Sequence, residues 1–254
     1  MKSNNPFFKT KSYTARQETQ VDTIHDSRAI VHEPMTVEGT INKTALLFGI
    51  LAITSTLTWY MASLGQNVLI MMIGGAVVGL ILVIVAAFKP HLSSYLAPGY
   101  ALFEGLFIGG LSYYFETMYP GIVIQAVSAT FVTFAVCLAL YKFRIVKVNQ
   151  TFRSVVIAST MAILTYYVIS FILNITGVYT PVHYGNSLMS IGISVFVIVI
   201  AAMNLFLDFD NIEDGVNNNQ PKYMEWFGAM GLMITLLWLY IEFLRLLSKL
   251  ASRD

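Results

Sequence analysis

Long apolar stretches alternate with short polar ones along most of this chain. Residues 44–88 contain no Asp, Glu, Lys or Arg, and residues 154–207 are free of them as well. A helix needs about 20 mainly apolar residues to cross the hydrocarbon core of a bilayer, so each stretch is long enough for two crossings. Polar breaks at 64–67 and 174–186 divide the two stretches. These regions therefore predict four transmembrane helices.

Three further apolar runs complete the pattern, one of them directly after Pro120 and Gly121. We predict an all-α integral membrane protein, a bundle of seven transmembrane helices. The spans lie near residues 44–63, 68–88, 96–114, 121–141, 154–173, 188–207 and 226–247. Glu242 and Arg245 fall in the final turns of the last helix. An alternative interpretation is therefore that this helix re-enters the membrane without crossing it.

Charge is concentrated at the start of the chain. Residues 1–43 hold eleven charged side chains and little apolar content, so we expect a polar, disordered tail followed by a membrane domain over residues 44–250. The whole chain is 56% hydrophobic and 11% charged, whereas soluble domains carry about a quarter charged residues. This composition argues against a soluble enzyme and against a nucleic-acid-binding protein. The chain has a single cysteine, Cys137, so no intrachain disulfide can form.

Basic residues predict the orientation. Six Lys and Arg lie in the tail and four in residues 142–153, whereas the connections after the first, third and fifth spans have none. Cytoplasmic loops carry the excess of Lys and Arg, so we expect a cytoplasmic N-terminus. Gly75–Gly79 and Gly105–Gly109 have the small-residue spacing that lets membrane helices approach closely.

Ionisable residues inside apolar runs are few. Each costs on the order of 3 kcal/mol at mid-bilayer, so it needs a partner, a water-filled cavity or a function. Glu104 lies near the centre of the third span, where it either lines an ion path or hydrogen-bonds to a neighbouring helix. Glu242 and Arg245 lie three residues apart on one helix face. Either they form an ion pair, or Arg245 extends to the headgroups and Glu242 follows it.

Four carboxylates follow the sixth span directly: Asp208, Asp210, Glu213 and Asp214. Oxygen ligands of this kind suit calcium. The string is not an EF-hand loop, because Ile212 and Glu213 occupy positions that need a ligand and a glycine. The cluster therefore either attracts a cation or forms a solvated acidic loop.

Signatures of catalysis are absent from the sequence. It has no H-E-x-x-H, no G-x-S-x-G and no phosphate-binding loop, and its four histidines lack metal-ligand spacing. We expect neither enzymatic activity nor a bound cofactor.

Several segments, in order, resemble the bacterial, YccA-like branch of the Bax inhibitor family. They are Met35–Ala45, the glycine-rich stretch Ala97–Gly110, Leu207–Glu213, Pro221–Trp226 and, most specifically, Leu236–Leu247 with its Trp-Leu-Tyr-Ile-Glu-Phe-Leu-Arg-Leu-Leu string. The resemblance covers about residues 35–250. It implies a seven-helix bundle and a pH-sensitive calcium leak.

In that family an acid at the end of span six shares a proton with an acid on span seven. Asp208 matches the first acid by its spacing from Ile212, and Asp210 is the other candidate. The position of the second acid, ten residues before Arg245, is Thr235, which cannot ionise. Glu242 lies two helical turns beyond Thr235 on nearly the same face, about 10 Å along the axis.

The resemblance and the sparse charge together favour a calcium leak or cation transporter. Protonation of Asp208 or Asp210 would gate it, and Glu242 and Arg245 would form a latch. The alternative is a non-conducting membrane protein that binds and regulates partners such as a membrane protease or a stress pathway. The expected partners are the lipid bilayer and a calcium ion as transported species, with no nucleic acid.

Overall fold

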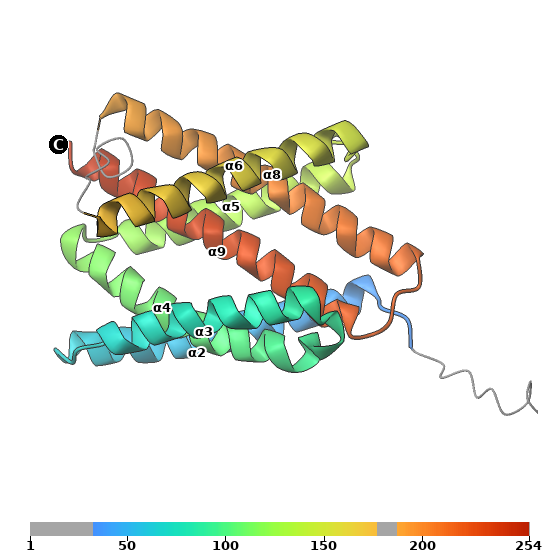
Figure 1. The fold of residues 1–254 in the computed structure, drawn as a ribbon, viewed down its shortest axis with the longest axis horizontal. Helices are drawn as coiled ribbons and strands as arrows, with labels where there is room; N and C mark the ends of the chain where they lie inside the picture. Colours follow the sequence, from blue (N-terminus) through green and yellow to red (C-terminus); the bar gives the residue numbers. More distant parts are fainter. Residues whose placement is uncertain (1–32, 177–186, 254) are drawn as a thin grey trace, which may run out of the picture. The chain divides into compact units, whose positions relative to one another are not determined.

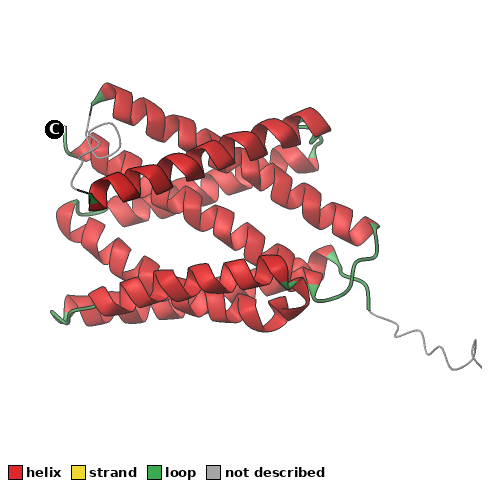
Figure 2. Cartoon of the chain, viewed as in Figure 1, coloured by secondary structure: helices red, strands yellow, loops and turns green. Residues whose placement is uncertain are grey.

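The computed structural model describes residues 33–176 and 187–253. This part of the chain is helical apart from turns and one isolated antiparallel bridge between Pro34 and Pro221 (Figure 2). The predicted disorder of the tail, and most of the predicted 174–186 turn, lie outside the described residues. The elements are α2 (Val37–Ser63), α3 (Leu69–Phe88), the 3₁₀ turn η2 (Pro90–Leu92), α4 (Ser93–Met118), α5 (Ile122–Lys142), α6 (Gln150–Ile175), α8 (Leu188–Asn217) and α9 (Met224–Ala251).

Six of the described long helices are apolar and long enough to cross a membrane. The exception is α4, which has 26 residues but a more polar composition that includes Glu104 and Glu116. The predicted spans match helices in order, although α2 begins before residue 44, and α8 and α9 extend past their predicted ends. Apolar content marks the hydrocarbon-crossing part of a helix, whereas hydrogen bonding and capping set where the helix itself ends.

Local sequence accounts for several helix ends. Thr36 caps α2, because its hydroxyl accepts a hydrogen bond from the Gly39 N–H at 2.9 Å. Gly65 (φ +77°) and Gly121 (φ +87°) adopt the left-handed conformation in the turns before α3 and α5. Pro90 follows the end of α3 and starts η2. The breaks predicted at 64–67 and 120–121 therefore coincide with turns between helices, and Lys89 separates α3 from η2.

Successive helices run in alternating directions (Figure 1). The start of α2 and the α3–α4, α5–α6 and α8–α9 connections consequently lie at the same end of the bundle. That end carries the described basic connections, including Lys89, Arg144, Lys147 and Lys222. α9 is a single unbroken helix of 28 residues and does not turn back along its length.

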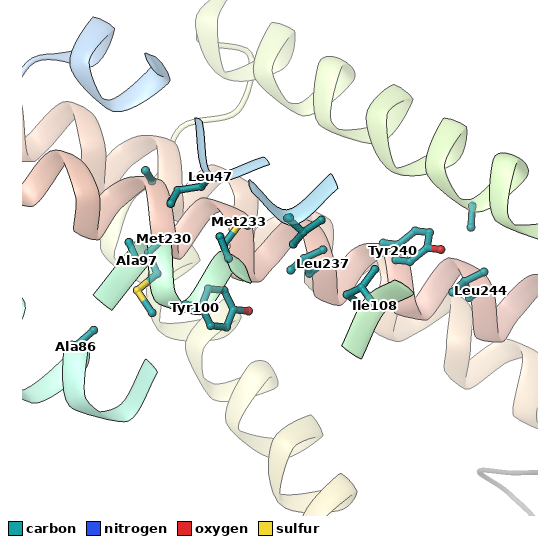
Figure 3. Close-up of a cluster of buried hydrophobic side chains, with 14 of the residues drawn as sticks. Leu47, Ala86, Ala97, Tyr100, Ile108, Met230, Met233, Leu237, Tyr240 and Leu244 are labelled. Carbon is teal, nitrogen blue, oxygen red and sulfur yellow. The ribbon is translucent and has the colours of Figure 1, made fainter. Parts of the chain in front are cut away.

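α9 is the central helix of the bundle, packing against α2, α4, α5 and α8. Its most apolar window is 61% buried, against 17–22% for α2, α3, α5 and α6. Met230, Met233, Leu237, Tyr240 and Leu244 lie along it in the main buried cluster (Figure 3). The outer helices can leave much of their apolar surface exposed because lipid, not water, covers it.

Glycines bring α4 against both of its neighbours. A Cβ on Gly105 or Gly109 would meet α2 at Leu51 and Ser55, and one on Gly75 of α3 would meet the backbone of Phe103. The close approach predicted from the small-residue spacing is therefore confirmed.

Substituting Gly109→Ala should destabilise the protein by about 1–3 kcal/mol, because the new methyl would overlap the Ser55 backbone, which cannot rotate away. Gly49→Ala is the matched control. A Cβ at Gly49 meets nothing within 4 Å, so alanine there should stabilise α2 by about 0.5–1 kcal/mol. Thermal unfolding in detergent measures both changes. Equal melting temperatures for the two variants would contradict the close α2–α4 approach.

Candidate functional site

A polar cavity of about 490 Å³ lies where α8 and α9 converge toward the end of the bundle that carries the basic connections. α8 and α9 provide most of the wall, and the segment before α2 and the α8–α9 connection provide the rest. The lining residues are Met35, Asp208, Asn211, Ile212, Asp214, Asn218, Gln220, Met224, Phe227, Gly228 and Gly231. We refer to it as the Asp208 cavity.

Asp208 faces α9 across this cavity. Its Oδ1 lies 3.9 Å from where a Cβ of Gly231 would stand, and the Thr235 hydroxyl lies beside the carboxyl group. Thr235 is itself buried, with 7% of its surface exposed. The sequence comparison of Asp208 with position 235 therefore identified a real spatial pair, and the group opposite Asp208 is a hydroxyl.

The second oxygen of Asp208, Oδ2, is buried and has no hydrogen-bond partner among the described residues. A buried polar atom left unsatisfied is costly, so such atoms are uncommon unless they serve a function or bind a ligand. Asn211, Asp214 and Gln220, whose side chains carry oxygen atoms, line the same cavity. Oxygen groups of this kind suit a hard cation, although no described group of three or more His, Cys, Asp or Glu residues is placed to hold a metal ion.

Asp210, the other sequence candidate, lies on a different side of α8. Its Oδ2 accepts a hydrogen bond from Arg153 Nη2 of α6 at 2.6 Å, and the same guanidinium bonds Asn211 Oδ1 at 3.0 Å. Glu213 is also engaged there, accepting a hydrogen bond from the Tyr141 hydroxyl at 2.5 Å. The acidic cluster is therefore divided: Asp208 belongs to the cavity, whereas Asp210 and Glu213 attach α8 to α6 and α5.

Glu104 is separate from both groups. It lies on α4 facing α3, where its Oε2 would be 2.8 Å from a Cβ at Gly79, and Tyr100 stands one turn away on α4. The absence of a side chain at Gly79 leaves room for the carboxyl group. Glu104 does not line the Asp208 cavity, so the structure does not support grouping it with Asp208 as one ion path.

The predicted Glu242–Arg245 ion pair is present on α9. Arg245 Nη1 donates to Glu242 Oε1 at 3.1 Å, and the Tyr167 hydroxyl of α6 donates to the same oxygen at 2.7 Å. The Arg245 guanidinium also lies over the Tyr167 ring, 5.2 Å from its centroid. Glu242 is only 2% exposed, so the interpretation that it extends to the headgroups is wrong.

This pair belongs to a second polar cluster, toward the opposite end of α9 from the Asp208 cavity. Lys249 completes it by donating to Ser194 Oγ at 2.8 Å and to the Ser190 carbonyl at 3.3 Å, both on α8. Glu242 and Arg245 are thus not in contact with Asp208. The sequence expectation that they serve as a latch on the same site has no direct contact to support it.

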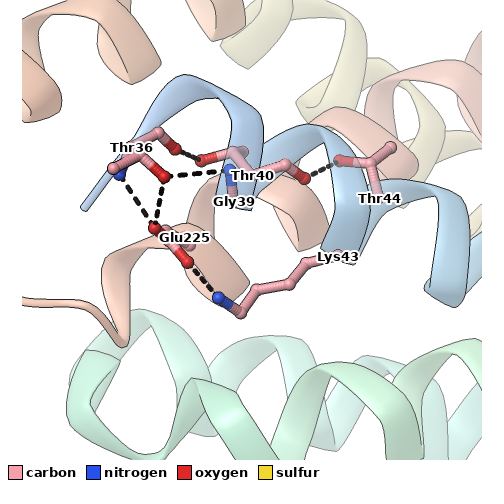
Figure 4. A network of polar contacts seen from close by, with 6 residues as sticks. All are labelled: Thr36, Gly39, Thr40, Lys43, Thr44 and Glu225. Carbon is pink, nitrogen blue, oxygen red and sulfur yellow. Dashed lines mark hydrogen bonds and ion pairs between the residues drawn. The ribbon is translucent and has the colours of Figure 1, made fainter.

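Sequence reasoning assigned no role to Glu225, which is fully buried at the start of α9. One of its oxygens accepts hydrogen bonds from the Thr36 backbone N–H at 2.8 Å and the Thr36 hydroxyl at 2.9 Å (Figure 4). The other forms an ion pair with Lys43, whose ammonium lies 5.4 Å from the Trp226 ring centroid. A Cβ on Gly39 would overlap this carboxylate. The sequence signals were an acid immediately before the last apolar run and its place in the resembling segment Pro221–Trp226.

A second cavity, of about 610 Å³, lies between α2, α4, α5 and α9. Its lining is mostly apolar, with Phe48, Trp59, Phe131 and Leu237 among the larger side chains. Its polar groups include Ser112 and Tyr240, whose hydroxyls hydrogen-bond to each other at 2.6 Å. Because no carboxylate lines it, the smaller Asp208 cavity is the candidate functional site.

Six apolar helices of membrane-crossing length define a multi-pass membrane protein that contacts the lipid bilayer. The family model described as Bax inhibitor 1 like matches residues 5–252, nearly the whole chain. The chain therefore belongs to the Bax inhibitor 1 like family. Neither the curated proteins nor the solved structures contain a match to it.

Replacing Glu242→Gln should lower the melting temperature more than Tyr167→Phe. The first change removes the negative charge that balances Arg245 and Lys249, and breaking a buried ion pair costs about 3–5 kcal/mol. The second change removes one hydroxyl, whose hydrogen bond to the carboxylate is worth about 1.5–3 kcal/mol. Thermal unfolding of the purified protein in detergent compares the two. If Glu242→Gln proved harmless while Tyr167→Phe destabilised, the ion pair would not be what stabilises this cluster.

Proposed function

We propose that this protein is a pH-sensitive calcium leak of the bacterial inner membrane, in the YccA-like branch of its family, and that all seven long helices cross the bilayer. The observation that carries the proposal is the buried carboxylate of Asp208, with an unpaired oxygen, in an oxygen-lined cavity. Membership of the Bax inhibitor 1 like family supports it.

The chemistry of the cavity suits a transient cation. An ionised Asp208 attracts a divalent ion, and the side-chain oxygens of Asn211, Asp214, Asn218 and Gln220 can replace part of its hydration shell. A leak needs weak, multiple contacts, because an ion held by a complete ligand set would not leave. Protonation of Asp208 removes the attracting charge, so calcium flux should rise as the pH rises.

The titratable groups that line the Asp208 cavity are Asp208 and Asp214. Asp214 has a 62% exposed side chain and lies 3.7 Å from Arg153, so its charge is largely screened by solvent and by the guanidinium. Thr235, opposite Asp208, does not ionise. We therefore propose that one carboxyl group, and not a proton-sharing pair, gives this protein its pH dependence.

The orientation follows from the basic residues. Lys89, Arg144, Lys147 and Lys222 share one end of the bundle with the start of α2, and cytoplasmic loops are enriched in Lys and Arg. We propose that this end, and with it the side of the bundle on which the Asp208 cavity lies, faces the cytoplasm. An odd number of crossings then leaves the C-terminal end of α9 on the opposite side.

Asp208→Asn should weaken calcium flux and abolish its dependence on pH. Asparagine has nearly the same shape as aspartate but stays neutral, so it no longer attracts the cation or responds to protons. Asp210→Asn, two residues along the same helix, is the matched control, because Asp210 pairs with Arg153 outside the cavity. Flux is measured with a calcium dye inside liposomes that contain the purified protein, from pH 6 to pH 8.

Three results would count against the proposal. If Asp208→Asn kept the wild-type pH profile, Asp208 would not be the sensor. If Asp210→Asn alone removed the pH dependence, the sensor would be the group of Asp210 and Glu213 on the other side of α8. If the wild-type protein conducted no calcium at any pH, the non-conducting regulator would replace the leak, and a stoichiometric protein partner retained in mild detergent would then identify its class.

A further inference from the structure

The segment just before α2 forms part of the wall of the Asp208 cavity. Residues 34–36, which we call the N-terminal strap, run alongside the α8–α9 connection. The Met35 N–H donates to the Gln220 carbonyl at 2.8 Å, and Pro34 forms an antiparallel bridge with Pro221. The strap is therefore attached by backbone contacts to the loop that joins the two cavity-forming helices.

Met35 occupies a specific place in that wall. Its side chain is only 3% exposed, and its sulfur lies where a side chain at Gly215 would otherwise be, 2.6 Å from the position of a Cβ. Gly215 is seven residues beyond Asp208 on α8, about 10 Å along the helix axis toward the end of the bundle. Met35 consequently stands between the Asp208 carboxylate and that end.

Glu225 holds the strap in place from the other side. Its carboxylate accepts both the backbone N–H and the hydroxyl of Thr36, while Lys43 one and a half turns into α2 balances its charge. Releasing the strap would remove the two Thr36 donors from a fully buried carboxylate, which is unfavourable. Hydrogen bonds to a charged acceptor are also among the stronger ones.

We propose that the N-terminal strap closes the Asp208 cavity. Met35 blocks the passage from the cavity to the end of the bundle that carries the basic connections, and Glu225 holds the strap in this position. The expected effect of the closure on calcium flux rests on the proposed function, because closing the cavity changes flux only if ions pass through it.

The test measures access to the cavity first and flux second. In a Cys137→Ser background, which removes the native cysteine, Asp208→Cys provides a thiol inside the cavity. A charged, membrane-impermeant thiol reagent should modify this thiol several-fold faster when Met35→Ala or Glu225→Gln is added. Met118→Ala, which truncates an exposed methionine of α4 outside the cavity lining, is the matched control and should leave the rate unchanged.

Calcium flux is then measured in liposomes with Asp208 intact. Met35→Ala and Glu225→Gln should raise flux several-fold at pH 8, and Met118→Ala should not. Met35→Ala removes no polar contact, so it tests the closure even if Glu225→Gln fails to fold.

Each result has a defined meaning. Unchanged thiol labelling in Met35→Ala would overturn the strap as a closure, whatever the flux. Faster labelling with unchanged or absent flux would uphold the closure but show that the cavity is not the ion path, and the proposed function would then fail. Faster labelling together with raised flux supports both.

Discussion

The central position of α9 is the constraint on which the rest of this structure depends. A helix surrounded by α2, α4, α5 and α8 cannot use lipid or water to satisfy its polar side chains, so each must find a partner on a neighbouring helix. Besides Tyr240, whose hydroxyl pairs with Ser112, such side chains include Glu225 at its start, Thr235 near its middle and Glu242 toward its end. Each marks a point where α9 is joined to a different part of the bundle.

The carboxylates at these three points differ in how completely their oxygen atoms are hydrogen-bonded. Glu225 and Glu242 each have a cation and at least one further hydrogen-bond donor, the arrangement that buried carboxylates need if they are not to destabilise the fold. Asp208, which faces Thr235, has one buried oxygen with no partner among the described residues. Among these three carboxylates, Asp208 is therefore the one whose hydrogen bonding is incomplete within the described residues, and this difference is the basis for proposing it as the functional group.

Sequence patterns identified the positions of the helices, but they treated the acids after the sixth span as one cluster, which the structure divides. The breaks predicted near Gly65 and Gly121 coincide with turns, because the left-handed conformation that glycine allows is a property of the residue itself. Pro90, which has no N–H to donate, acts in the same local way at the start of η2. Asp208, Asp210 and Glu213 look alike in sequence, yet the helical rotation of about 100° per residue sends them to different sides of α8. Their partners Thr235, Arg153 and Tyr141 come from three different helices, at separations that no local pattern encodes.

The amino-acid sequence by itself determined that the chain is helical, membrane-embedded and sparsely charged, because hydrophobic length and the cost of charge in lipid are properties of each segment alone. The resemblance to the Bax inhibitor family, and not the sequence pattern alone, pointed to Asp208 and position 235 as a pair. Only the tertiary structure decided which acids are paired and which one is left incomplete. It also revealed the Glu225–Lys43 contact, which joins residues 182 positions apart. Such contacts depend on how whole helices pack, and no single segment carries that information.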